Sequence, residues 1–356
     1  MKTASKGIYT FRYDASSGKL TPLGVAAETP DPSWVAVHPS GRFLYAVNEA
    51  GKNSMVSAFA IDSGSGKLTL LNQLPALGED PCYLSFDKTG KYVLVANYTS
   101  GNVVVFPIGG DGKLGASTAN IRDEGQLGPN KERQEAPHAH WIGTRGNTVF
   151  VADLGLDRIL VYKFDPTKGT LSPMPEAGSK SIRPQQPIVL GPGTGPRHVV
   201  ISGKPNRNHI IFMYILGELD SSVNANLTTK EGDFGIRTRK VSMLPAGFSG
   251  RNDAAEIEIH PNGKFLYASN RGHDSIVVYS IDQDWGKLKQ VADVSTGGKE
   301  PRHFAIDPTG NFLLAEDQLS DKIVTFRIDQ NTGALTPTRD SVEVPSPVCI
   351  AFLPVE

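Results

Sequence analysis

Histidine, arginine and glutamate recur at two fixed positions of a segment that the chain repeats. His138, Arg197 and Arg302 each directly follow the residue that opens a copy of this segment. Glu218 and Arg271 each directly follow the second strand of a copy. Guanidinium groups that share a site are costly without an anion, and histidine exchanges protons near neutral pH. These residue types predict a site that binds an anion and carries out acid–base chemistry.

Each of these residues also has a structural interpretation. His138 can close a strand by bonding to a turn carbonyl, Arg197 and Arg271 can tie neighbouring repeats together, and Glu218 can simply neutralise the arginines. The shared position of His138, Arg197 and Arg302 favours the functional interpretation. Further polar residues, which we expect to bind substrate or to support the reacting groups, are His140, His198, Glu256, Arg302, His303 and Glu49.

The repeated segment is a strand, a turn and a second strand. Its copies cover residues 32–48, 81–97, 137–153, 196–217, 254–270 and 301–317, and a seventh opening strand, PVCIAFLP, covers 347–354. Each full copy is followed by a third strand and then a more polar fourth strand, often after a Gly-x-Leu turn. Seven openings in 356 residues give a period of about fifty, which is typical of four-stranded propeller blades. The pattern predicts an all-β, seven-bladed β-propeller that occupies residues 1–356 as a single domain.

The two ends of the chain are expected to close this ring together. The N-terminal segment GIYTFRYDASSGKLTPLG lacks opening strands of its own, so it is interpreted as strands three and four of the blade that PVCIAFLP opens. The second strand of that blade is then missing, which predicts a three-stranded closing blade and an N-terminus trimmed relative to the natural one.

The repeat also predicts where polar residues gather. The second strand runs antiparallel to the first, so its end lies beside the start of the first. The starts of first strands and the ends of second strands therefore share one end of the ring, here called the polar end. Asn48, Asn97 and Asn270 recur there and are interpreted as turn formers that bond to the backbone. The opposite turns, such as HPSG and DPTG, have ordinary β-turn composition.

Composition narrows the class of partner. The chain has 36 Lys and Arg against 37 Asp and Glu, so neither nucleic acid nor a membrane surface is an expected partner. No apolar run reaches the roughly 18 residues of a membrane helix, and MKTASKG lacks the apolar core of a signal peptide. We expect a cytoplasmic monomer or weak homo-oligomer, with export of a longer natural form left open. Cys82 and Cys349 are expected to be buried free thiols, without metal-site spacing.

Several stretches resemble the lactonase family of seven-bladed propellers, which includes propeller-type 6-phosphogluconolactonases and fungal carboxy-cis,cis-muconate cyclases. The most specific are PHAH at 137–140, GPRH at 195–198, GELDSSV at 217–223, AEIEIHPNGKFLYASNRGHDSI at 255–276 and GKEPRHFAIDPTGNFLLAEDQ at 298–318. The resemblance covers almost the whole chain. In the cyclase branch it implies an active site of His138, Arg197, Glu218 and Arg271. Two departures lie beside that site: Gly217 stands where relatives commonly have Asn, and Asp317 replaces the Asn of an ANQ motif.

The leading hypothesis is a lactonase that needs neither metal nor cofactor and hydrolyses an anionic sugar lactone such as 6-phosphogluconolactone. Arg197 and Arg271 would hold the anionic group and stabilise the oxyanion, with His138 as general base or acid and Glu218 orienting and charge-balancing it. Ring closure of an unsaturated diacid remains an alternative, as does a calcium-dependent sugar lactonase that uses Glu256, Glu49 and Asp317. A non-catalytic binding propeller would instead present aromatic residues such as Trp34, Tyr83 and Tyr98.

Overall fold

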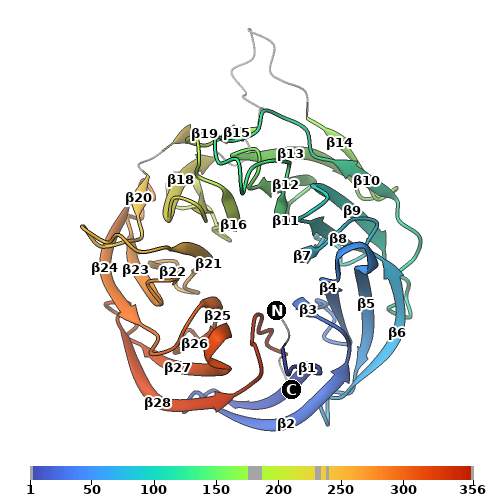
Figure 1. The fold of residues 1–356 in the computed structure, drawn as a ribbon, viewed down its shortest axis with the longest axis horizontal. Helices are drawn as coiled ribbons and strands as arrows, with labels where there is room; N and C mark the ends of the chain where they lie inside the picture. The colour runs from blue at the N-terminus through green and yellow to red at the C-terminus, as the bar shows by residue number, and fades with distance from the viewer. Residues whose placement is uncertain (1–2, 175–186, 229–233, 238–239, 354–356) are drawn as a thin grey trace.

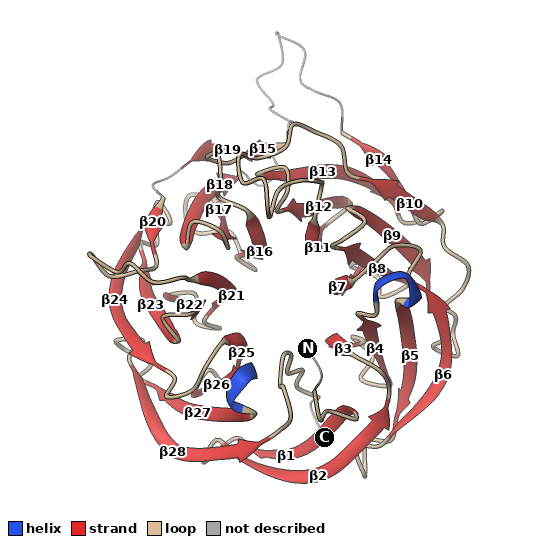
Figure 2. Cartoon of the chain, in the orientation of Figure 1, coloured by secondary structure: helices blue, strands red, loops and turns tan. Residues whose placement is uncertain are grey.

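Antiparallel sheets arranged around a common axis make up the chain (Figures 1 and 2). The computed structural model describes residues 3–174, 187–228, 234–237 and 240–353. Within them, six sheets have four or more strands and a seventh sheet has two. Two 3₁₀ turns, Gly51–Asn53 and Gln318–Ser320, are the helical elements of these residues, and no helix there is long and apolar enough to cross a bilayer.

The six larger sheets follow one another along the chain. The first contains β3 (Pro32–Val37), β4 (Phe43–Asn48), β5 (Met55–Ile61) and β6 (Leu68–Pro75). The second contains β7 (Pro81–Phe86), β8 (Tyr92–Asn97), β9 (Asn102–Pro107) and β10 (Ala119–Arg122). The third contains β11 (Ala139–Arg145), β12 (Thr148–Asp153), β13 (Arg158–Asp165), β14 (Thr170–Pro173) and β15 (Ile188–Val189). The fourth contains β16 (Pro196–Ile201), β17 (Ile211–Gly217), β18 (Ser222–Thr228), β19 (Phe234–Arg237) and β20 (Val241–Ser242). The fifth contains β21 (Asp253–Ile259), β22 (Phe265–Arg271), β23 (Ser275–Ile281) and β24 (Leu288–Ser295). The sixth contains β25 (Pro301–Ile306), β26 (Phe312–Asp317), β27 (Lys322–Ile328) and β28 (Leu335–Glu343).

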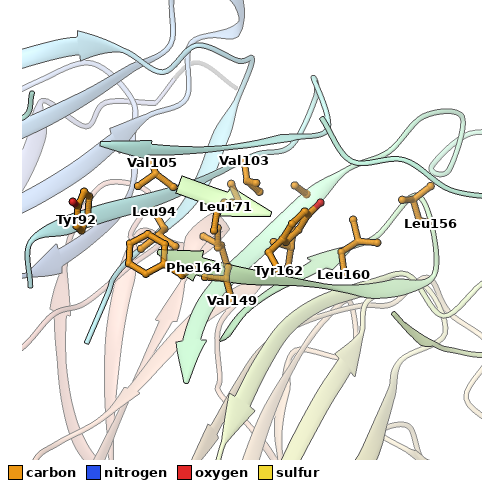
Figure 3. Packing of buried hydrophobic residues seen from close by; sticks show 14 residues of the cluster. Tyr92, Leu94, Val103, Val105, Val149, Leu156, Leu160, Tyr162, Phe164 and Leu171 are labelled. Carbon is orange, nitrogen blue, oxygen red and sulfur yellow. The ribbon is translucent and has the colours of Figure 1, made fainter. Parts of the chain in front are cut away.

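Each sheet is a propeller blade whose first strand lies nearest the axis (Figure 1). The second and third strands are almost continuous apolar runs, because both faces of a blade are covered by its neighbours. Figure 3 shows one such interface, where Tyr92 and Val105 of the second blade pack with Val149 and Phe164 of the third. The predicted propeller architecture is therefore confirmed.

A recurring contact between a glycine and an aromatic ring joins successive blades. The glycine of the turn before the fourth strand has positive φ, and a Cβ on it would overlap the first aromatic residue of the preceding blade's second strand, as for Gly286 against Phe212 and Gly333 against Phe265. The tyrosine two residues after each of these aromatic residues also binds the blades together: Tyr214 Oη donates to the carbonyl oxygen of Gly286 at 3.0 Å.

The seventh sheet consists of β1 (Gly7–Asp14) and β2 (Lys19–Glu28), and it lies between β28 and β6 (Figure 1). It makes the same contacts on both sides. Gly18 fits against Phe312 of the sixth blade, and Gly66 of the first blade fits against Thr10. Thr10 Oγ1 also donates to the carbonyl oxygen of Gly66 at 2.8 Å.

The expected opening strand at 347–354 is not formed as predicted. Its described residues, 347–353, have no strand assignment, so the expected three-stranded closing blade contains two strands. The segment nevertheless packs on the two-stranded sheet, with the rings of Tyr13 and Phe352 5.1 Å apart edge to face. Cys82 and Cys349 are free thiols as expected, but Cys349 is only partly buried.

Each of the six first strands begins with a β-bulge. One extra residue follows the first pair, or the second pair in the fifth blade, as between Pro32 and Trp34 or between Pro301 and His303. A bulge re-aims the side chains around it, and bulges are common beside functional sites. The bulges turn residues near the start of the first strands, among them Arg197 and Arg302, out of the regular alternation of the sheet.

The register of the third blade differs from the sequence-based alignment. Only Gly146 and Asn147 separate Arg145 from its partner Thr148, whereas residues 38–43 separate the paired residues Val37 and Leu44 of the first blade. The shorter turn moves the pairing by two residues, so Ala139 pairs with Asp153 where Pro137 was expected. His140 therefore occupies the bulge position that Arg197 and Arg302 share, and His138 directly precedes the strand.

Candidate active site

Three arginines converge on the buried carboxylate of Glu218 at the polar end. Glu218 directly follows β17, and its Oε2 atom lies 3.0 Å from Nε of Arg197 and 3.1 Å from Nη2 of Arg271. Its Oε1 atom lies 2.5 Å from Nη2 of Arg133. The structure thus brings together Arg197, Glu218 and Arg271, which come from three different strands or strand ends, as the sequence predicted.

The electrostatics of this cluster depend on pairing in a dry environment. Burial raises the pKa of Glu218, but Arg271 and Arg197 outweigh it, so the pKa lies well below its usual range. Burial, followed by repulsion from Arg271, lowers the pKa of Arg197 to about 10. Arg197 also donates from Nη1 to the carbonyl oxygen of Ala255. Three cations therefore contact the single carboxylate of Glu218, and Arg133 also pairs with Asp253; an array of fixed cations of this kind is suited to a developing negative charge.

Arg133 is the member of this cluster that the sequence analysis missed. It lies in the segment between β10 and β11, residues 123–138, here called the rim loop. Nη1 of Arg133 lies 3.4 Å from Oδ1 of Asp253, and Nη2 is 3.5 Å from Oη of Tyr98. The repeat carries no information on a segment between two blades. The available signal was the length of the loop, since long loops in compact domains are commonly functional.

His138 ends the rim loop and is buried. Its Nδ1 atom lies 3.0 Å from the carbonyl oxygen of Tyr98, and its Nε2 atom lies 3.1 Å from Oε1 of Glu135. Its ring is stacked on that of Tyr98, with centroids 4.5 Å apart. The carboxylate in contact with His138 is thus Glu135. The expected contact between Glu218 and His138 is not formed, because the Glu218 carboxylate pairs with Arg133, Arg197 and Arg271.

His140 is buried, and its Nδ1 atom has no hydrogen-bond partner among the described residues. Its ring meets Tyr98 edge to face at 5.6 Å and His198 at 5.2 Å. Burial, and next the charge of Arg197, hold the pKa of His140 well below its usual range. His140 is therefore a neutral imidazole beside the arginine cluster.

Of the remaining predicted residues, His198, Glu256 and His303 form one buried group, and Arg302 and Glu49 form a separate ion pair. Nδ1 of His198 lies 3.0 Å from both carboxylate oxygens of Glu256, and Nε2 of His303 lies 3.5 Å from Oε2 of the same carboxylate. Burial lowers the pKa of His303, but Glu316 outweighs it and raises the pKa to about 9. Arg302 instead pairs with Glu49 at 3.7 Å, at the partly exposed surface.

The three carboxylates considered for calcium have separate partners. Glu49 faces Arg302, Glu256 faces His198, and Asp317 accepts a hydrogen bond from Oγ1 of Thr296 at 2.6 Å. Among the described residues, no group of three or more His, Cys, Asp or Glu side chains is arranged to hold a metal ion.

Comparisons with known proteins place the whole chain in one family. Residues 1–352 match the model of the family described as "Lactonase, 7-bladed beta-propeller". The chain is 37% identical over 355 residues to the 6-phosphogluconolactonase of Bacillus subtilis, covering 99% of this chain and 96% of that protein. It is 33% identical to the 6-phosphogluconolactonase of Formosa agariphila, covering 85% and 83%. The solved structure of the periplasmic gluconolactonase of Pseudomonas aeruginosa superimposes with a TM-score of 0.89 at 31% identity, covering 99% and 96%.

Proposed function

The chain belongs to the lactonase family of seven-bladed β-propellers, and from that premise we propose that it hydrolyses a sugar lactone, 6-phosphogluconolactone above all. Such an enzyme is a carboxylic ester hydrolase: water adds to the ring carbonyl, and the ring C–O bond then breaks to give the open acid. The observation that carries the proposal is the cluster of three arginines on Glu218, linked through Tyr98 to His138.

Arg197 and Arg271 are the proposed oxyanion-stabilising groups. When water attacks, negative charge develops on the carbonyl oxygen, and donors already fixed in a dry site stabilise it without reorganising. Glu218 holds both guanidinium groups in place through one carboxylate oxygen. Arg271 is more exposed than Arg197, so we expect the substrate to contact Arg271 before Arg197.

His138 is the proposed general acid–base group. Both of its ring nitrogens face oxygen acceptors, an arrangement that the doubly protonated ring satisfies, and this form can protonate the leaving alkoxide. In the neutral form, Nδ1–H still donates to the carbonyl oxygen of Tyr98, which leaves the lone pair of Nε2 to accept a proton from water. Glu135 is exposed, so we expect its carboxylate either to move away from Nε2 when the substrate binds or to stabilise the positive charge of the protonated His138 ring.

The test compares freshly prepared 6-phosphogluconolactone with unphosphorylated gluconolactone, with and without excess chelator. Wild type should hydrolyse the phosphorylated lactone rapidly in both conditions, and Arg197→Ala should lose at least about a hundredfold in kcat, as expected when an oxyanion donor is removed. Loss of wild-type activity in chelator would instead favour a metal-dependent reaction. If wild type hydrolyses neither lactone, the proposed reaction is wrong.

We also propose that the two-stranded sheet and the C-terminal segment together act as the seventh blade. The glycine contacts of Gly18 and Gly66 support this proposal because they repeat the contact found between the larger blades. Closure in this way keeps the first and sixth blades, which carry Glu49 and Arg302, facing one another.

A further inference from the structure

The three guanidinium groups on Glu218 differ in their access to solvent. The exposed fraction of the side chain is 4% for Arg197, 13% for Arg271 and 37% for Arg133. A guanidinium group carries five N–H donors, and the contacts of Arg133 with described residues use only Nη1 and Nη2. Arg133 is therefore the cation of the cluster that an anion arriving from solvent meets first.

The position of Arg133 is held by its neighbours in the rim loop. Gln134 is fully buried, and its Nε2 atom donates to the carbonyl oxygen of Leu154 at 2.8 Å. The Gln134 carboxamide lies against Gly128, where a Cβ would overlap it. The backbone N–H of Gln134 donates to the carbonyl oxygen of Asn130 at 2.7 Å. Because the loop is already ordered around Arg133, binding of a ligand to this arginine loses less conformational entropy.

Arg133 contacts both parts of the proposed active site. Its Nη2 atom lies next to both Glu218 and the hydroxyl group of Tyr98, its Nη1 atom lies next to Asp253, and the Tyr98 ring is stacked on His138. A lactone whose carbonyl group lies between His138 and Arg271 would therefore have another part of the molecule within reach of Arg133. In a phosphorylated aldonolactone, the group remote from the carbonyl is the phosphate.

We propose that Arg133 binds the phosphate group of a phosphorylated aldonolactone and sets the preference for that substrate over its unphosphorylated counterpart. This inference rests on the proposed function and adds to it the residue that recognises the anionic substituent. It moves that task from the buried Arg197 and from Arg271 to a residue with free donors. Arginine suits the task because its planar fork matches the oxygens of a phosphate.

A second role for Arg133 would be to position Glu218 only. In that case its removal would weaken hydrolysis of both lactones equally, because the reacting carbonyl group is the same in both. Recognition of phosphate instead predicts a much larger rise in KM for the phosphorylated lactone than for its unphosphorylated counterpart. The two roles are thus separated by the ratio of kcat/KM for the two substrates.

The experiment measures kcat and KM for 6-phosphogluconolactone and gluconolactone with wild type, Arg133→Gln and Arg133→Lys. Lys131→Gln is the matched control, because Lys131 is an exposed cation of the same loop without a described partner. Arg133→Gln should raise KM for the phosphorylated lactone at least about tenfold more than it raises KM for gluconolactone. Arg133→Lys should recover part of the loss, and Lys131→Gln should match wild type on both substrates.

Three results would overturn the inference. Equal losses on both lactones in Arg133→Gln would assign Arg133 to the positioning of Glu218. Wild-type kinetics in Arg133→Gln would remove Arg133 from the site. A wild type that hydrolyses both lactones without preferring the phosphorylated one would exclude phosphate recognition while leaving the lactonase function standing, whereas activity on neither lactone would contradict the proposed function itself.

Discussion

At the scale of single residues, the site depends on one buried carboxylate that neutralises several arginines. Arg197 is buried almost completely, and Glu218 is its acidic partner among the described residues. Breaking a buried ion pair by removing one partner is costly, because the other charge stays buried without compensation. Glu218 is therefore expected to contribute to stability as well as to catalysis.

Replacing Glu218 by Gln tests this dual role. The variant keeps the shape of the side chain but leaves Arg197 unpaired, so we expect it to lose about 3 kcal/mol of unfolding free energy at pH 7. Because the pKa of Glu218 is lowered on folding, its contribution is present above the unfolded value of 4.5 and is lost as the pH falls below it. The difference between variant and wild type in urea unfolding should therefore shrink below pH 4.5.

Glu49→Gln provides the control for that experiment. Glu49 also pairs with an arginine, but at 3.7 Å and with both side chains partly exposed. Exposed pairs contribute less than about 1 kcal/mol, so this variant should unfold almost as wild type does. Equal stabilities for Glu218→Gln and wild type would show that Arg197 does not need Glu218 as a counter-ion.

His138 and His140 make a second comparison at this scale. His138 contacts two oxygen atoms, whereas the pKa of His140 is held low by burial and by Arg197, so His140 stays neutral. We expect His138→Ala to reduce kcat at least about a hundredfold and His140→Gln to reduce it far less. Rates of lactone hydrolysis, with circular dichroism as a check on folding, measure this. The reverse order would make His140 the proton-transfer group.

Much of this residue pattern could be predicted because the repeat places it. Arg197, Glu218 and Arg271 lie at strand ends, and antiparallel pairing requires such ends to meet. Arg133 and Glu135 could not be found in the same way, because they lie in the rim loop, which has no counterpart in the other blades. Tertiary packing of Gln134, rather than a local pattern, determines where that loop lies.

At the scale of strands, the ends of several second strands carry a polar residue that ties a blade to the segment before it. The side-chain amide of Asn97 donates to the carbonyl oxygen of Ala76 at 3.3 Å, and that of Asn270 donates to the carbonyl oxygen of Met243 at 3.1 Å. Asp317 occupies this position in the sixth blade. It has no N–H to donate, and its Oδ2 atom has no hydrogen-bond partner among the described residues.

Replacing Asp317 by Asn should stabilise the protein. Burial raises the pKa of Asp317 to about 6, so at neutral pH its charge is held in an unfavourable environment. Asn removes that charge and restores the donor, for an expected gain of about 1 kcal/mol at pH 7. Folded Asp317 binds its proton more tightly than the unfolded chain does, so this gain should decrease as the pH falls from 6 toward 4.

The reverse substitution controls for the position itself. Asn270→Asp would place a buried carboxylate at the same end of the fifth blade and should destabilise the protein by a similar amount or more. Melting temperatures at pH 7 and pH 4.5 measure both changes. If Asp317→Asn were neutral at both values, a charge–charge contact such as that with Lys322 would have to compensate for burial of the carboxylate.

The strands themselves were predictable in kind, but not everywhere in register. Alternating apolar residues and recurrent turns indicate the hairpins, and five of the six blades follow the aligned pattern. In the third blade the two-residue turn at Gly146 shifts the pairing, although the repeat keeps its length. Counting from the opening proline therefore placed His138 where His140 lies.

At the scale of the whole molecule, a propeller is stable only if its last blade meets its first. The six larger blades contain strands that the repeat indicates, but the closing sheet has two strands and an irregular C-terminal segment beside it. Its interfaces use the contact found between the other blades: Gly18 lies against Phe312, and the Thr325 Oγ1 atom donates to the carbonyl oxygen of Gly18 at 3.3 Å. Closure should therefore depend on this glycine.

Three glycine-to-alanine variants measure how tightly the ring is closed. Gly18, Gly286 and Gly263 all have positive φ, but a Cβ at Gly263 meets nothing, whereas Cβ atoms at Gly18 and Gly286 would overlap Phe312 and Phe212. Gly263→Ala should cost about 1 kcal/mol of unfolding free energy through backbone strain alone. Gly286→Ala should cost about 1–3 kcal/mol more, because it also forces two blades apart. If the two-stranded sheet closes the ring as a full blade, Gly18→Ala should cost as much as Gly286→Ala; a cost equal to that of Gly263→Ala would mean that the sheet is only loosely attached.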